Sequence, residues 1–171
     1  MNRKMNKRSN RWVPLLALLG GVSDATAQVP DAINAPGESA VVTMHAQGAQ
    51  VYECKADVGG RLGWQLREPV ATLILEGKTV GHHYAGPTWE HSDGSSIVAK
   101  TVGHAPGVAQ RDIPWQKLEV TERRGTGVLT EISTIQRINT QGGATDGACE
   151  RAGALLSMPY SADYVFLRKD R

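Results

Sequence analysis

Apolar and polar positions alternate in short runs along most of the chain, and turn-forming residues separate these runs. Because successive side chains of a strand point to opposite faces, such alternation is typical of half-buried β-strands. The runs predict strands at 40–46, 49–55, 62–67, 70–75, 78–84, 96–102, 116–122 and 159–168. Short strands separated by glycine and proline turns indicate an all-β fold, either an antiparallel β-sandwich or a barrel-like single domain.

The segment 128–140 has a different spacing. Its apolar residues recur at every third position: Leu129, Ile132, Ile135 and Ile138. On a helix of 3.6 residues per turn this spacing drifts by about 60° per step, and several residues here are β-branched. We therefore expect a strand, with one short helix near 128–140 as the alternative.

The first 27 residues have the form of a secretory signal peptide. A basic start leads into an apolar run, Trp12 to Val22, and then to the small residues of Ala25-Thr26-Ala27. The apolar run is too short for a membrane span, which needs roughly 20 residues. We expect Sec-type export and cleavage after Ala27, which places the protein in the periplasm or outside the cell. Residues 28–39 are expected to form an extended lead-in to one β-rich domain at 40–171, with no transmembrane segment.

Charge changes sign when this leader is removed. Of the 19 basic and 17 acidic residues, five basic and one acidic lie in residues 1–27, so 14 basic face 16 acidic side chains in the remainder. Affinity for nucleic acid comes from clustered Lys and Arg. The mature chain therefore has no expected nucleic-acid partner.

Two cysteines, Cys54 and Cys149, are the only ones in the sequence. In an oxidising compartment an even number of cysteines predicts a disulfide. A metal-binding thiolate pair or two free thiols are the alternatives, but the Cys-x-x-Cys spacing of such sites is missing.

Potentially catalytic side chains are densest at 82–95, which holds three histidines, two carboxylates, a tyrosine and a tryptophan. Imidazoles with a carboxylate suit Zn or Cu, and His104 would be a further ligand. In a strand, however, His82 and His83 point to opposite faces. We therefore expect no metal site and no cofactor. A serine triad around Asp93 lacks a Gly-x-Ser-x-Gly elbow, and a glycosidase pair of Glu90 and Asp93 has no further support.

Aromatic and cationic residues suggest further candidates. Trp64, Trp89 and Trp115 suit either core packing or stacking against a sugar or another flat ligand, and core packing is the simpler interpretation. Arg137 stands among apolar residues, where it would pair with Asp163 or Glu90 or hold an anionic ligand. We expect the structural ion pair.

A series of motifs runs through the chain after the leader. They are Gln50-Val51-Tyr52-Glu53-Cys54, Gly81, His83-Tyr84-Ala85-Gly86-Pro87-Thr88-Trp89, Asp93-Gly94-Ser95, Ile113-Pro114-Trp115, Ile135-Gln136-Arg137-Ile138-Asn139-Thr140, Gly142-Gly143, Cys149, Pro159-Tyr160-Ser161-Ala162-Asp163-Tyr164 and Phe166. Together they resemble a family of exported bacterial proteins, also found in fungi, domain-of-unknown-function family 3455. The resemblance implies membership and no particular activity. His83 matches the family motif, whereas His82, His91 and His104 lie outside it.

These observations predict an exported binding module rather than an enzyme. The candidates for one shared surface or cleft are His83, Trp89, Glu90, Asp93, Trp115 and Arg137. The expected function is a non-enzymatic periplasmic or secreted binding or envelope-associated role, with a carbohydrate or another small molecule as ligand. The alternative is a hydrolase or metal-dependent enzyme that uses the His83–Asp93 region.

Overall fold

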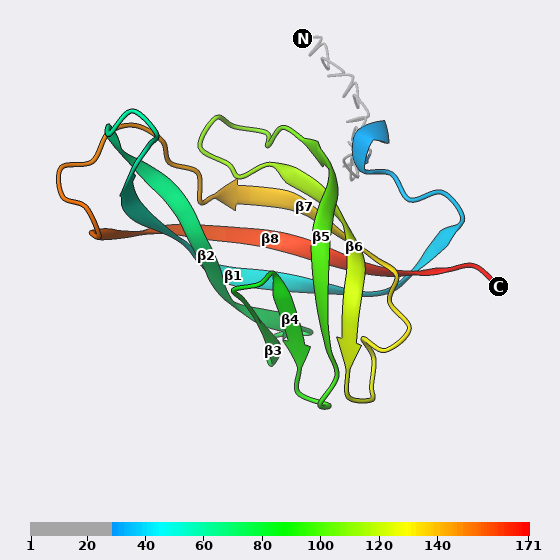
Figure 1. Cartoon of the computed structure of the whole chain (residues 1–171). Coiled ribbons are helices and arrows are strands. Elements are labelled where there is room, and N and C mark those ends of the chain that lie inside the picture. Colours follow the sequence, from blue (N-terminus) through cyan, green and yellow to red (C-terminus); the bar gives the residue numbers. More distant parts are fainter. Residues whose placement is uncertain (1–28) are drawn as a thin grey trace, which may run out of the picture.

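Eight antiparallel strands follow one another along the chain, and the last pairs with the first to close a barrel (Figure 1). The computed structural model describes residues 29–171, so the predicted signal peptide lies outside the described residues. The strands are β1 (Glu38–Ala56), β2 (Leu62–Leu75), β3 (Lys78–Tyr84), β4 (Thr88–His91), β5 (Ser96–Ala105), β6 (Trp115–Arg124), β7 (Thr134–Gly142) and β8 (Leu155–Lys169). A 3₁₀ turn, η1 (Asp31–Ile33), precedes them. The predicted all-β class is confirmed, and the barrel is the architecture present.

The predicted strands all fall within observed strands. Two pairs of them merge, because 40–46 and 49–55 both belong to β1, and 62–67 and 70–75 both belong to β2. The segment 128–140 contains turns and then β7, so the strand expected there is confirmed from Thr134 onward. The pattern missed β4, whose four residues are too few to show a period.

Alternate residues of each strand point into the barrel, and one end of the interior is filled by apolar side chains. Met44, Ile97 and Phe166 are almost completely buried there. Leu129 and Ile132, from the connection between β6 and β7, pack into the same cluster and close this end. This cluster is the hydrophobic core of the protein.

Toward the other end, inward positions carry polar side chains, among them Gln50 of β1 and Arg137 of β7. The connection between β5 and β6, residues 106–114, lies across this end (Figure 1). The buried Thr140 hydroxyl donates a hydrogen bond to the Ile113 carbonyl at 2.7 Å and fastens the connection to β7. The barrel is therefore covered at both ends but is apolar at only one.

The wall of the barrel is incomplete on one side because β3 and β4 are short. β2 pairs with β3 only from Ala71 to Leu75, and β5 pairs with β4 only from Ser96 to Val98. Beyond the β3–β4 hairpin, no strand formed by residues 29–171 lies between β2 and β5 (Figure 1). The side chain of Leu66 on β2, which shares a face with the inward-pointing Tyr52, is consequently 58% exposed.

A disulfide joins Cys54 of β1 to Cys149, as predicted. Cys149 lies in the connection between β7 and β8, and the two Cα atoms are 5.9 Å apart across 95 residues of sequence. Disulfides persist in oxidising compartments, so this bond fits an exported protein. None of the helices within residues 29–171 has the length and apolar character needed to cross a membrane.

Candidate functional site

A cavity of about 270 Å³ lies inside the polar end of the barrel, beside the gap between β2 and β5. Its inner wall carries Gln50, Tyr52, His83, Trp89, Arg137 and Tyr164. The rest of its lining includes the apolar side chains of Leu66, Pro69, Pro87, Ile113 and Leu118 and the polar side chains of Thr101 and Gln116. Eight-stranded barrels are just wide enough either to be filled by side chains or to hold one small ligand. This barrel is filled at one end and hollow at the other.

Arg137 is a buried cation in the wall of this cavity, with only 9% of its surface exposed. Its Nε and Nη2 atoms both donate hydrogen bonds to the Pro114 carbonyl, at 3.1 and 2.8 Å. The ion pair expected with Asp163 or Glu90 does not form. The Asp163 carboxylate contacts His45 and Asn139, and the Glu90 carboxylate accepts a hydrogen bond from the Tyr84 hydroxyl.

No carboxylate within residues 29–171 forms a salt bridge with Arg137. Removing a charge from water is costly, and buried charges are normally paired with a group of opposite charge. The Pro114 carbonyl is a neutral dipole and leaves the positive charge of the guanidinium uncompensated. The cavity wall therefore carries a positive charge without a fixed counter-ion.

His83 is held in the cavity wall as a neutral imidazole. Its Nδ1 atom lies 2.9 Å from the Thr88 carbonyl, which can only accept, so Nδ1 carries the proton and Nε2 is left as an acceptor. Burial lowers the pKa of His83 from 6.5 to about 4; the hydrogen bond to Thr88 opposes this shift, and the nearby charge of Arg137 contributes to it. The ring stacks on Trp89 with centroids 4.2 Å apart, and Tyr164 meets both rings edge-on.

Several buried polar atoms around the cavity have no hydrogen-bond partner. They are Nε2 of Gln50, Nε1 of Trp89 and the hydroxyls of Tyr160 and Tyr164. Tyr160 does not line the cavity but lies close to Gln50 and Tyr164, and the Tyr164 hydroxyl lies close to Arg137; none of these contacts has the geometry of a normal hydrogen bond. Buried polar groups are nearly always paired, so a concentration of unpaired groups in one region requires an explanation. Burial raises the pKa of both tyrosines, so both hydroxyls stay protonated and able to donate.

The six residues predicted from the sequence divide into two sets of three. His83, Trp89 and Arg137 meet at the cavity. Glu90 is exposed on β4 and is bound by Tyr84. Trp115 is buried in a separate small cluster with Ile33 and Ala105, under the N-terminal lead-in.

Asp93 lies in the turn between β4 and β5, where it organises the backbone. Its carboxylate accepts hydrogen bonds from the backbone N–H and hydroxyl of Ser95 and from the Val128 N–H. Burial opposes ionisation, but these hydrogen bonds together lower the pKa of Asp93 below its ordinary value. A Cβ on Gly127 would lie 2.2 Å from this carboxyl group, so the loop can approach Asp93 only with glycine at that position. His83 and Asp93 therefore take part in different local structures.

No group of three or more His, Cys, Asp or Glu side chains within residues 29–171 lies close enough together to hold a metal ion. His82 is exposed, whereas His83 is buried, so the two adjacent histidines face opposite sides of the sheet. His91 contacts the Asp93 carboxylate at 3.1 Å in the β4–β5 turn. The histidines of the 82–95 segment are thus divided among three environments.

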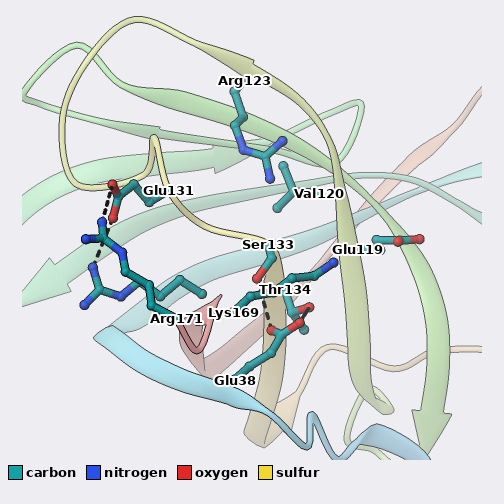
Figure 2. A pocket seen from close by; sticks show the side chains of 10 residues that line it. Glu38, Glu119, Val120, Arg123, Glu131, Ser133, Thr134, Lys169 and Arg171 are labelled. Carbon is teal, nitrogen blue, oxygen red and sulfur yellow. Dashed lines mark hydrogen bonds and ion pairs between the residues drawn. The ribbon is translucent and has the colours of Figure 1, made fainter.

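A second hollow lies on the outer surface between β6, β7 and the C-terminal residues (Figure 2). Figure 2 shows that two of its carboxylates, those of Glu38 and Glu131, are already bound by other side chains of the hollow. Glu131 pairs with Arg168 and Arg171, and Glu38 accepts hydrogen bonds from the hydroxyls of Ser133 and Thr134. This internal pairing makes the hollow a weaker candidate than the barrel cavity.

Sequence reasoning missed Gln50, Tyr52, Tyr160 and Tyr164 as site residues. A signal for them exists in the alternation of the strands. Gln50 and Tyr52 fall on the same side of β1 as the buried Met44, and a glutamine on an apolar face indicates a polar interior. Tyr160 and Tyr164 likewise alternate with exposed or half-buried residues along β8.

The model of a family described as "Protein of unknown function (DUF3455)" matches residues 35–168. The chain belongs to this family. The match spans all eight strands except Lys169, the last residue of β8, and confirms the resemblance seen in the sequence motifs. No curated protein and no solved structure matches the chain. Membership in DUF3455 thus establishes what the chain is related to, and the cavity is the guide to what it does.

Proposed function

We propose that this DUF3455 protein is a non-enzymatic binding protein that holds a small molecule in the cavity of its barrel. The observation that carries the proposal is the set of buried polar groups left unpartnered around that cavity. A ligand that accepts hydrogen bonds would pair Gln50 Nε2 and the Tyr164 hydroxyl, which otherwise remain unsatisfied. His83, Trp89 and Arg137 are the proposed binding residues carried over from the sequence.

The size of the cavity limits the ligand. About 270 Å³ is near the lower end of the range for ligand pockets, which is about 300–1,000 Å³. This volume suits a single ring with a short substituent. Trp89 and Trp115 are 1% and 5% exposed, so neither offers a flat outer surface on which a sugar chain would stack.

The proposed binding protein acts outside the cytoplasm. The leader predicted at residues 1–27 would direct the chain to the periplasm or the exterior by the Sec route, where the Cys54–Cys149 disulfide is stable. An enzyme built on the His83–Asp93 region has less support, because Asp93 is committed to the β4–β5 turn. We therefore favour binding over hydrolysis.

The test is a ligand-observed NMR screen of a fragment library that contains acids, amides, alcohols and sugars. Leu66→Trp narrows the cavity mouth, since Leu66 lines the cavity and is 58% exposed. Leu155→Trp is the matched control, because Leu155 is 55% exposed on β8 and lies away from the cavity lining. We expect fragments to bind the wild type and Leu155→Trp at least tenfold more tightly than Leu66→Trp. The absence of any bound fragment, or equal binding to all three proteins, would contradict the proposal.

A further inference from the structure

We propose that the ligand of this cavity is a small organic carboxylate whose charged end binds Arg137 and whose apolar body lies toward the gap between β2 and β5. This inference rests on the proposed binding function and specifies the chemical class of the ligand. It follows from three features of the cavity: its charge, the type of its unpaired atoms and the distribution of polar and apolar wall.

Charge is the first feature. Arg137 brings a permanent positive charge into a wall where no carboxylate of residues 29–171 compensates it. A guanidinium has five N–H donors, and here its Nε and Nη2 groups serve one neutral carbonyl. Its planar fork matches the geometry of a carboxylate, and such charge-assisted pairs are the strong ones. An anionic ligand supplies the missing counter-charge.

The second feature is that two of the unpaired polar atoms around the cavity are able to donate. Gln50 Nε2 has N–H donors only, and the Tyr164 hydroxyl carries a proton because burial raises its pKa. Both residues are buried, at 2% and 0% exposure, so water in bulk does not satisfy them. An ionised carboxylate accepts hydrogen bonds and donates none, which matches these two donors.

The third feature is the change from polar to apolar wall across the cavity. The donors belong to β1, β7 and β8, whereas Leu66, Pro69 and Pro87 line the side of β2 and the β3–β4 turn. A ligand that is charged throughout, such as inorganic phosphate, would leave this apolar side without a partner. A carboxylate with a ring or short hydrocarbon chain covers both sides.

The experiment measures binding of defined probes to the full mature protein by isothermal titration calorimetry. The probes are benzoate, hexanoate, their neutral amides benzamide and hexanamide, and inorganic phosphate. We expect at least one carboxylate to bind tenfold or more tightly than its amide and than phosphate. If the amides bind as well as the acids, the carboxylate inference fails while cavity binding stands. If phosphate binds as tightly as the acids, the site is a general oxyanion site and the inference also fails.

Two variants separate a ligand-binding role from a structural one. Arg137→Met removes the charge and should weaken carboxylate binding by at least tenfold, but it also leaves the Pro114 carbonyl unpaired and so lowers stability. Tyr164→Phe removes only a hydroxyl that makes no hydrogen bond of normal geometry in the free protein, although the Tyr160 and Arg137 side chains lie close to it. It should leave the melting temperature of the free protein unchanged or higher, yet weaken carboxylate binding about tenfold. A Tyr164→Phe protein that binds benzoate and hexanoate like the wild type would overturn the proposal.

If the fragment screen finds neutral ligands in the cavity and none of the carboxylates binds, only the inference about ligand class fails. If the screen finds nothing and the carboxylates do not bind either, the proposed function fails with it. The two results are distinguishable because the screen includes neutral fragments and the mouth variant Leu66→Trp.

Discussion

Burial of individual polar residues defines the chemistry of this barrel. His83 is the clearest case, because it is 3% exposed, stacked on Trp89 and beside the charge of Arg137. Desolvation penalises its protonated form, so its pKa falls from 6.5 to about 4. The imidazole stays neutral at the pH of most compartments and leaves Arg137 as the cation of the cavity wall.

This shift makes stability depend on pH. In the unfolded chain His83 takes up a proton as the pH falls below about 6.5, whereas in the folded protein it does so only near pH 4. Between these values the unfolded state binds more protons, so the free energy of unfolding decreases as the pH falls. From pH 7 to pH 4.5 we expect His83 to account for a loss of about 2 kcal/mol.

Urea unfolding at a series of pH values measures this dependence. The His83→Gln variant should show a shallower decline than the wild type, even where its absolute stability is lower. His82→Gln is the matched control, because His82 is the adjacent residue of the same strand and is exposed. Equal pH slopes for the wild type and His83→Gln would show that the buried imidazole does not have the lowered pKa.

Secondary-structure elements determine where the cavity opens and how it is covered. The hairpin of β3 and β4 is shorter than β2 and β5, and this difference in length creates the opening beside Leu66. The connection at 106–114 and the residues after β7 cover the adjacent end of the barrel. Tyr52 donates to the Gly143 carbonyl at 2.8 Å, and a Cβ on Gly143 would lie 2.7 Å from Tyr160 Cβ. Glycine at position 143 lets the residues after β7 pack directly against Gln50 and Tyr160.

The disulfide joins two elements, because it links the connection between β7 and β8 to the end of β1. Closing a loop across 95 residues raises the free energy of the unfolded chain by about 4–5 kcal/mol in the chain-entropy model.

We expect the Cys54→Ala/Cys149→Ala variant to have a free energy of unfolding several kcal/mol lower than the wild type, and therefore to unfold at a lower urea concentration. Reduction of the wild type should have the same effect. Thiol titration of the denatured, unreduced protein should find no free thiol. Two titratable thiols, or an unchanged unfolding midpoint in the double variant, would contradict this prediction.

The elements also show how far the sequence predicts the structure. Alternation identified the long strands, since each strand of the barrel has one face inside and one outside. It did not identify β4, which has only four residues, and it did not distinguish a barrel from a sandwich, because both have strands with one buried face.

Only three of the six site candidates, His83, Trp89 and Arg137, line the cavity, for a different physical reason. Chemical composition drew attention to the 82–95 segment, where Glu90 and Asp93 serve local structure. The cavity draws residues from all eight strands, and their convergence depends on strand register. Arg137 was identified as unusual, but its lack of an ionic partner was visible only once Asp163 and Glu90 had been placed with other partners.

The molecule as a whole is a barrel with an apolar filled end and a polar hollow end. Its family, DUF3455, spans residues 35–168, which include both ends. The slightly acidic balance of residues 28–171, with 14 basic and 16 acidic side chains, makes the buried positive charge of Arg137 a local exception. A small anion that enters beside Leu66 would be drawn to the cavity by this local charge and not by the overall charge of the protein.

The most direct test is a crystal structure of residues 28–171 grown with benzoate. We predict electron density for benzoate inside the barrel, with a carboxylate oxygen about 3 Å from the Arg137 guanidinium and within hydrogen-bond distance of the Tyr164 hydroxyl. The ring should lie toward Leu66 and Pro87. A cavity that holds only water, with benzoate absent or bound elsewhere on the surface, would contradict the account.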